Sequence, residues 1–285
     1  MSSASLWIIR PRTESADPAL CANAQLNDIF GLDIRADVMP EDISLAGERI
    51  VRILENSDVK MTFSVVGTTQ NIADAIKKAP AVFKKKCAGI YLVAGTGIET
   101  EGGALEYNVR LNPGSYSAVL NAPCPVYWTP CYHTILPPVK ERGGEYSCVY
   151  AFYQKEVLES LPEVMKKYFL YMLTRSSDPK YLRYLREPVD EKALEEFGNM
   201  KRRLWSTPAI LRAAGVGMET AEFLPVKVHT EPDGHTSWTH AAEEETDKFI
   251  LHIRAFDAET DDTFDTGGSY KKEMTEKLTE YLNML

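Results

Sequence analysis

Hydrophobic positions in the first half of the chain alternate between two patterns. Short, continuous apolar runs at Met61–Val66, Ile90–Ala94 and Pro125–Trp128 have the length of buried strands and are too short for helices. Between them, Asn71–Lys86 repeats its apolar residues at helical spacing until a proline interrupts it, and Pro113–Asn121 predicts a second helix. Strands that alternate with helices of this length indicate βαβ units and a parallel sheet.

The rest of the chain continues this mixture. Apolar periodicity predicts further helices at Ala19–Phe30, Asp42–Asn56, Gln154–Leu173, Asp178–Arg186, Asp190–Asn199, Arg203–Ala214 and Lys271–Leu285, and further strands at Leu6–Ile9, Glu222–Val228 and Phe249–Phe256. No linker rich in Gly, Ser or Pro divides the sequence. We therefore expect a single α/β domain over residues 1–285, with an open, mostly parallel sheet and helices on both faces.

The loops that follow the three central strands are the expected ligand-binding edge. In open parallel sheets, ligands bind beyond the carboxyl ends of the strands. Here those loops are Gly67–Asn71, Gly95–Asn108 and Thr129–Thr134.

Three short motifs in these loops resemble those of one enzyme family, in the same order and at similar spacing. The turn G-T-T-Q-N-I-A at 67–73 resembles G-P-L-T-N-L-A, and L-V-A-G at 92–95 resembles L-M-G-G. E-Y-N-V at 106–109, followed by N-P at 112–113, resembles E-F-N-V with a following D-P. The family is that of the inosine/uridine-preferring nucleoside hydrolases, which cleave the N-glycosidic bond of ribonucleosides. The resemblance implies their fold, without the first strand, because the sequence before Leu6 leaves no room for it.

The resemblance also assigns residues to a ribose-binding site. It implies that Glu106 and Asn108 hold the sugar, with Asn71 in the neighbouring turn. A carboxylate accepts hydrogen bonds from hydroxyls, whereas an amide both donates and accepts. Trp128 and Trp205 either face the base or belong to the core, and the sequence leaves both interpretations open.

The calcium ion of the family is not expected in this chain. The backbone carbonyl of Val66 holds the place of one family ligand, but the family also uses an aspartate-rich loop near its N-terminus, and the first five residues here contain no acid. A late H-D-P-L-A motif supplies a further carboxylate in the family. Here W-S-T-P-A-I-L at 205–211 puts Thr207 in that position. We expect no metal and no other cofactor, and the sequence identifies no catalytic residue.

Two functions stay open at this point. One is hydrolysis of N-glycosidic bonds in ribonucleosides, which includes the case of a native N-terminus longer than the one shown. The other is a catalytically inactive relative that serves as a ligand-binding or assembly protein. A nucleoside or riboside is the expected small-molecule partner, and the resemblance implies a homo-oligomer.

The amino-acid composition limits the expected partners and the expected cellular location. The formal net charge of −9 argues against nucleic acid as a partner, and no run of residues has the length and hydrophobicity of a membrane span. Five cysteines without a C-x-x-C motif, together with a start that does not read as a signal peptide, favour reduced thiols in the cytoplasm. Four residues, His229, Asp233, His235 and His240, suggest zinc by their number, but their spacing matches no ligand pattern and surrounds a strong turn signal.

Overall fold

The computed structural model describes residues 6–10, 34–38, 46–97, 105–131, 144–173, 187–254 and 268–284. The contacts within the chain divide it into two compact units. The larger unit comprises residues 46–151 and 203–274, and the smaller one comprises residues 1–45, 152–202 and 275–285. That the whole chain forms one domain stays a prediction.

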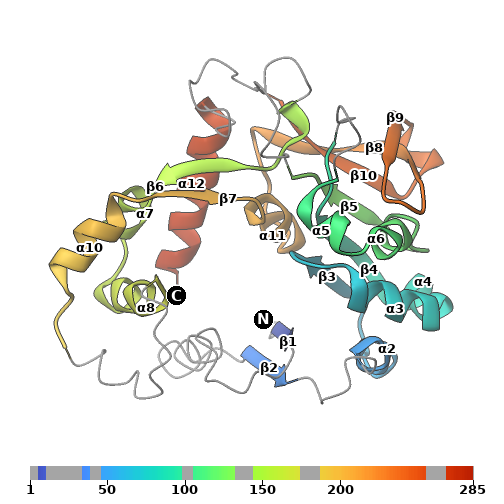
Figure 1. Cartoon of the computed structure of the whole chain (residues 1–285), viewed down its shortest axis with the longest axis horizontal. Helices are drawn as coiled ribbons and strands as arrows, with labels where there is room; N and C mark the ends of the chain where they lie inside the picture. The colour runs from blue at the N-terminus through green and yellow to red at the C-terminus, as the bar shows by residue number, and fades with distance from the viewer. Residues whose placement is uncertain are drawn as a thin grey trace. The chain divides into compact units, whose positions relative to one another are not determined.

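A six-stranded mixed sheet forms the centre of the larger unit (Figure 1). Its strand order is β3-β4-β5-β10-β8-β9. The strands are β3 Met61–Val65, β4 Cys87–Val93, β5 Val126–Thr129, β8 Ala221–Thr230, β9 Thr236–His240 and β10 Lys248–Ile253. The first four in this order, from β3 to β10, run parallel to one another, whereas β8 is antiparallel to β10 and β9 is antiparallel to β8. The predicted mostly parallel sheet is confirmed, and its antiparallel edge follows from the hairpin between β8 and β9.

The two faces of the sheet differ in their side chains. Ile90, Val126 and Ile250 are fully buried and belong to the hydrophobic core. The alternate positions carry rings: Tyr91 stacks on Tyr127 with centroids 4.6 Å apart, and Tyr127 stacks on Phe249 at 5.0 Å. Because successive strand residues point to opposite faces, this stripe of rings lies on the face opposite the aliphatic core.

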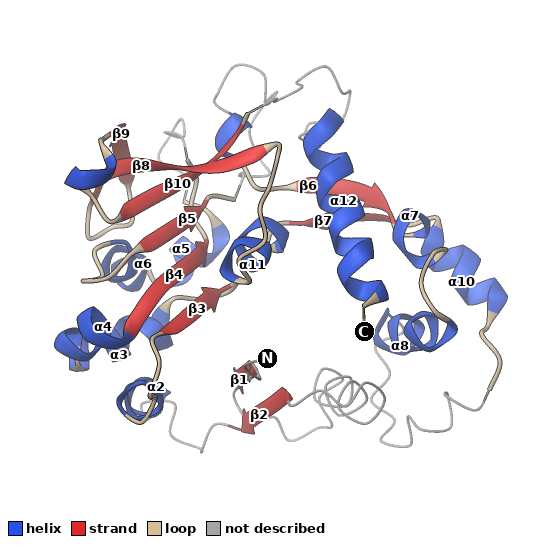
Figure 2. Cartoon of the chain, turned by 180° about the vertical axis from the view of Figure 1, so that it is seen from behind, coloured by secondary structure: helices blue, strands red, loops and turns tan. Residues whose placement is uncertain are grey.

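Helices cover both faces of this sheet (Figures 1 and 2). The unit contains α2 Ala46–Glu55, α3 Gln70–Lys78, α4 Pro80–Lys86, α5 Tyr107–Leu111, α6 Pro113–Leu120, α11 Thr207–Ala213 and the short 3₁₀ helices η4 Gly144–Tyr146 and η5 Glu243–Glu245. Helices α4 and α6 pack on β4 and β5, and α3 packs on α6, whereas α11 contacts β3, β4 and β5. Phe83 of α4 and Val119 of α6 are fully buried, so these helices bury the aliphatic face.

The smaller unit is mainly helical. It contains α7 Lys155–Leu158, α8 Glu163–Leu173 and α10 Glu191–Gly198, and α10 contacts both α7 and α8. Strands β1 Leu6–Arg10 and β2 Ile34–Val38 form a separate parallel pair. Three elements contain residues of both units: strands β6 Tyr150–Tyr153 and β7 Lys201–Leu204, which form a second two-stranded sheet, and the last helix, α12 Gly268–Asn283.

Most of the predicted elements are confirmed within the described residues. The helix predicted over Asn71–Lys86 divides at its proline into α3 and α4, and the one predicted over Gln154–Leu173 divides into α7 and α8. The predicted helix Arg203–Ala214 was too long, because it begins only at Thr207 and β7 comes before it. The helices predicted at Ala19–Phe30 and Asp178–Arg186 lie outside the described residues. Among the described helices, none has both the length and the hydrophobicity that crossing a membrane requires.

Candidate functional site

The loops at the carboxyl ends of β3, β4 and β5 are joined by hydrogen bonds. The backbone N–H of Gly95, after β4, donates to Glu106 Oε2 at 3.1 Å. The N–H of Cys131, after β5, donates to the carbonyl of Gly95 at 2.7 Å. The side-chain amide of Asn112 donates to Gln70 Oε1, which links the turn after β3 to the start of α6. The described parts of the three predicted loops therefore form one connected edge.

The carboxylate of Glu106 lies at the centre of this edge and is almost fully buried, with 8% of the residue exposed. Its Oε2 atom accepts three backbone hydrogen bonds, from Gly95, from Asn108 at 3.0 Å and from Val109 at 3.4 Å. From the described residues, its Oε1 atom accepts a single bond, donated by Asn108 Nδ2 at 3.2 Å. Since the two oxygens of a carboxylate together offer about four lone-pair positions, Oε1 keeps the capacity to accept one further donor.

These contacts also explain why α5 begins where it does. Glu106 is the N-cap residue of α5, and its side chain satisfies N–H groups that the first helical turn leaves without partners. Asn112 does the same for α6, where its Oδ1 accepts from the N–H of Ser115 at 3.0 Å and Pro113 occupies the first turn. Two side-chain caps within seven residues hold this segment in a fixed path.

Gly95 permits the close approach of the loop to α6. Its φ of +75° favours glycine, and a Cβ atom there would lie 2.2 Å from the hydroxyl of Tyr116. That hydroxyl is buried and has no hydrogen-bond partner in the described part of the chain, and burial raises the pKa of Tyr116 far above its ordinary value. The nearby side chain of Thr236 lowers the pKa of Tyr116, but by less than burial raises it. The hydroxyls of Tyr116 and Thr236 are not in hydrogen-bonding geometry.

Further buried polar groups surround the end of β5. Among the described residues, the hydroxyls of Thr129 and Ser147 find no hydrogen-bond partner. Interaction with the thiol of Cys148 raises the pKa of Cys131, and burial and the charge of Glu106 raise it further. In the described part of this edge, hydroxyls and thiols therefore surround the carboxylate of Glu106.

The other predicted site residues lie in different surroundings. Asn71 is the second residue of α3 and is half-buried, next to Gln70 in the connected edge. Val66 directly follows β3 and is 56% exposed. Trp128 is 1% exposed, and its indole Nε1 donates to the carbonyl of Ala94 at 2.7 Å, so its side chain belongs to the core in this structure. Trp205 is half-buried in the bend between β7 and α11. The ligand-binding roles predicted for these residues stay predictions.

Sequence reasoning missed Gln70 and Asn112, which connect two of the loops. The sequence carries a local signal for Asn112 alone. Asn112 directly precedes a proline that opens a helix, which is typical of an N-cap residue. Its contact with Gln70 spans 42 residues, and no local pattern reports such a contact.

Among its described residues, this edge lacks the set of carboxylates that a calcium ion of the family type requires. Calcium takes six to eight oxygen ligands, largely carboxylates. Thr207, in the position of the late aspartate, is buried and exchanges a 2.8 Å hydrogen bond with the hydroxyl of Tyr150. One oxygen of the Glu106 carboxylate, Oε2, already accepts three backbone N–H groups. Within the part of the chain that the structure describes, no three His, Cys, Asp or Glu side chains gather as metal ligands would.

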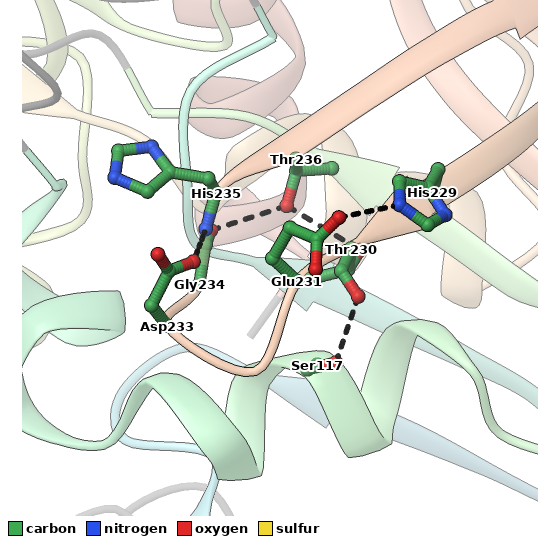
Figure 3. A network of polar contacts seen from close by, with 8 residues as sticks. All are labelled: Ser117, His229, Thr230, Glu231, Asp233, Gly234, His235 and Thr236. Carbon is green, nitrogen blue, oxygen red and sulfur yellow. Dashed lines mark hydrogen bonds and ion pairs between the residues drawn. The ribbon is translucent and has the colours of Figure 1, made fainter.

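The histidine-containing hairpin between β8 and β9 forms a turn that packs against α5 and α6 (Figure 3). His229 Nε2 lies 2.7 Å from Glu231 Oε1, and Asp233 Oδ1 accepts from the N–H of His235 at 3.1 Å. Gly234, with φ of +93°, approaches Val109 so closely that a Cβ atom would lie 2.7 Å from its Cγ1. In Figure 3 the imidazole of His235 points away from that of His229, which agrees with the turn predicted for this segment.

Comparison with known proteins gives structural relatives only. No model of a known protein family matches the chain, and no curated protein matches it by sequence. Among solved structures, it is similar to the inosine-uridine preferring nucleoside hydrolase from Bacillus anthracis, with 13% identity, a TM-score of 0.50, and coverage of 99% of this chain and 90% of that one. It is also similar to the purine-preferring ribonucleoside hydrolase from Gardnerella vaginalis, with 13% identity, a TM-score of 0.52, and coverage of 99% and 91%. A plant nucleoside hydrolase matches with 11% identity, a TM-score of 0.53 and complete coverage of both chains.

These matches confirm the resemblance that the motifs indicated, at the level of the fold. The chain has the nucleoside hydrolase fold, and the similarity extends over its whole length. At identities this low, the likeness concerns the fold and leaves the activity open.

Proposed function

We propose that this chain binds a ribonucleoside or a related riboside at the carboxyl edge of β3, β4 and β5, with Glu106 and Asn108 on the ribose. The observation that carries the proposal is the asymmetric use of the Glu106 carboxylate. Three backbone donors fix Oε2, whereas Oε1 accepts, among the described residues, only the amide of Asn108 and keeps room for a hydroxyl. The nucleoside hydrolase fold supports the choice of ligand.

Two neighbouring ribose hydroxyls match this arrangement chemically. One hydroxyl donates to Glu106 Oε1, and the other is held by the side-chain amide of Asn108, which both donates and accepts. Because the carboxylate is already fixed by backbone groups, little side-chain freedom is lost when the sugar binds.

The second candidate function is hydrolysis of the N-glycosidic bond, because the structurally similar proteins are named as hydrolases. Hydrolysis requires a base that activates water and stabilisation of a developing positive charge on the sugar. The Oε2 atom of Glu106 is committed to backbone N–H donors, and Thr207 carries a hydroxyl where the family has a carboxylate. Binding without cleavage is therefore the function that the described residues support better. We further propose that the chain forms a homo-oligomer.

Calorimetric titration with inosine, uridine and their 2′-deoxy analogues tests the binding proposal. Both ribonucleosides should bind, and the deoxy analogues should bind about 10- to 100-fold more weakly, because a hydrogen bond to a charged group contributes about 1.5–3 kcal/mol. Glu106→Gln should cause a similar loss, since its amide oxygen can replace Oε2 while its NH₂ group cannot accept a hydroxyl. Glu231→Gln, on the exposed hairpin, is the matched control and should bind normally.

Absence of binding for all four compounds would overturn this proposal. Release of ribose from inosine or uridine, measured as reducing sugar with and without added calcium, decides between the two candidates. Turnover that stops on addition of a chelator and in Glu106→Ala would establish the hydrolase and refute binding alone.

A further inference from the structure

The amino ends of the parallel strands carry two patches of opposite charge. Because β3, β4, β5 and β10 run parallel, the residues that precede these strands lie at one end of the sheet, opposite to the site around Glu106. Basic residues precede β3 and β4, whereas acidic residues precede β10. The segment N-A-P-C-P at 121–125 precedes β5, contains no charged residue and separates the two patches.

The lysine patch consists of four exposed residues, Lys60, Lys77, Lys84 and Lys85. Lys60 directly precedes β3, whereas Lys84 and Lys85 lie in the last turn of α4, which leads into β4 (Figure 2). Lys77 lies in the last turn of α3, just before α4 begins. Since β3 and β4 pair directly, these four residues belong to one part of the surface. Among the described residues, none forms a hydrogen bond or an ion pair with the four ammonium groups.

The groups around the lysine patch leave it positive. Lys86 is half-buried, and its ammonium donates at 2.5 Å to a backbone carbonyl of the turn between α2 and β3. Lys78 is paired with Glu48 at 2.7 Å, so these two charges cancel. The nearby carboxylates are those of Glu55, at the end of α2, and Asp58, in the turn before β3. Lysines therefore outnumber carboxylates here, in a chain whose formal net charge is −9.

The acidic patch consists of four exposed residues, Glu243, Glu244, Glu245 and Asp247. The backbone carbonyl of Asp247 accepts from the first N–H of β5 at 2.9 Å, which fixes this segment at the amino end of the sheet. Glu245 and Asp247 pair with lysines of β8 and β10. In the described part of the chain, Glu243 and Glu244 have no ion pair, so their charge is available to a partner.

The two patches are complementary between two copies of the chain. Neighbouring strands lie about 4.8 Å apart, so the starts of β4 and β10, with β5 between them, are about 10 Å from each other. A two-fold axis that crosses this surface near β5 places the lysine patch of each copy against the acidic patch of the other. Val59, which is 69% exposed beside Lys60, adds apolar area to the same surface. Such a contact is closed and ends at two copies.

We propose that two copies of the chain associate through this end of the sheet, with the lysine patch of each on the acidic patch of the other. This contact presupposes the homo-oligomer proposed above and assigns its interface. A second copy fits better than a nucleic acid or an anionic membrane, because the acidic patch on the same surface repels both of these polyanions.

Sedimentation equilibrium of the full chain, over a range of protein concentrations, tests the contact. The chain should form a dimer at 0.1 M NaCl. At 1 M NaCl the association should weaken at least about tenfold, because the Debye length falls from about 10 Å to about 3 Å.

Charge reversal identifies the surface. The double substitution Lys84→Glu with Lys85→Glu leaves two acidic patches, and Glu243→Lys with Glu244→Lys leaves two basic ones. Each protein alone should associate about tenfold or more weakly than the unmodified chain, because like charges then meet. An equimolar mixture of the two should recover the association to within about threefold, because every contact again joins opposite charges.

A matched control separates this contact from an effect of net charge. Glu195→Lys with Glu196→Lys, at exposed positions of α10, changes the net charge as much as Glu243→Lys with Glu244→Lys does. It should leave the association unchanged. Far-UV circular dichroism checks that every variant is folded. If Lys84→Glu with Lys85→Glu fails to fold, Lys84→Gln with Lys85→Gln replaces it and should weaken the association about threefold.

A dimer that withstands both reversals and high salt, or a mixture that fails to recover the association, would overturn the assigned interface and leave the homo-oligomer in place. An unmodified chain that is monomeric at every concentration would refute both. Nucleoside binding at Glu106 is measured separately by calorimetry, so it can fail while this interface stands, or the reverse.

Discussion

Replacement of Glu106 by alanine gives the most informative single test of the site, because one side chain joins a helix cap to a neighbouring loop. The substitution removes the acceptor for the N–H groups of Asn108 and Val109 in the first turn of α5. It also removes the partner of the N–H of Gly95, which is buried. Both losses destabilise the folded state.

The expected cost is the sum of two contributions. Loss of a helix cap costs about 1 kcal/mol. A buried N–H group that loses its acceptor costs about 1–3 kcal/mol. Glu106→Ala should therefore lower the free energy of unfolding by about 2–4 kcal/mol. Glu106→Gln should lower it by less, because its single amide oxygen can occupy the position of Oε2.

Urea denaturation at pH 7, followed by tryptophan fluorescence, measures this difference. Glu231→Ala is the matched control, because that carboxylate is exposed and bonds only to His229 among the described side chains; its effect should stay within about 0.5 kcal/mol. If Glu106→Ala costs no more than Glu231→Ala, the account of Glu106 as the anchor of this edge is wrong.

Three further substitutions test neighbouring parts of the structure. Tyr116→Phe should leave the stability unchanged or raise it by up to about 1 kcal/mol in urea denaturation, because the hydroxyl it removes is buried and no described residue pairs with it. Gly95→Ala should instead destabilise the fold by more than about 2 kcal/mol in the same assay, since it adds a Cβ against that hydroxyl at a positive φ. Glu222→Gln should cost about 0.2–1 kcal/mol near pH 7. Arg254 lowers the pKa of Glu222, so this cost should be fully present above the ordinary pKa of 4.5 and disappear as the pH falls through the lowered value; a loss that persists at low pH would contradict this ion pair.

The elements of the larger unit could be predicted from the sequence because each carries its own pattern. The strands from Met61 to Thr129 are short apolar runs, and P-D-G at 232–234 marks the turn between β8 and β9. Strand β7 could not be predicted, since Lys201–Leu204 reads K-R-R-L and has no apolar alternation. Its strand conformation comes from pairing with β6, an interaction between distant segments that overrides local preference.

The site could be predicted only in part, for a similar reason. Motifs identified Glu106 and Asn108, which lie two residues apart and contact each other. They did not identify the hydrogen bond from Gly95 to Glu106 or the one from Asn112 to Gln70, because both depend on how the loops pack against one another. Nor could the sequence decide between core and pocket for Trp128, since an indole suits both; the structure buries its ring and satisfies its N–H with a carbonyl.

The capping and the ligand-binding interpretations of Glu106 do not exclude each other. A cap needs one acceptor oxygen aimed at the first turn of the helix, and Oε2 supplies it. A sugar site needs an acceptor that is already fixed in place, and Oε1 becomes such an acceptor because Oε2 cannot move. The two roles therefore use different atoms of one carboxylate, and Glu106→Gln separates them: it retains most of the stability while it loses the riboside, whereas Glu106→Ala loses both.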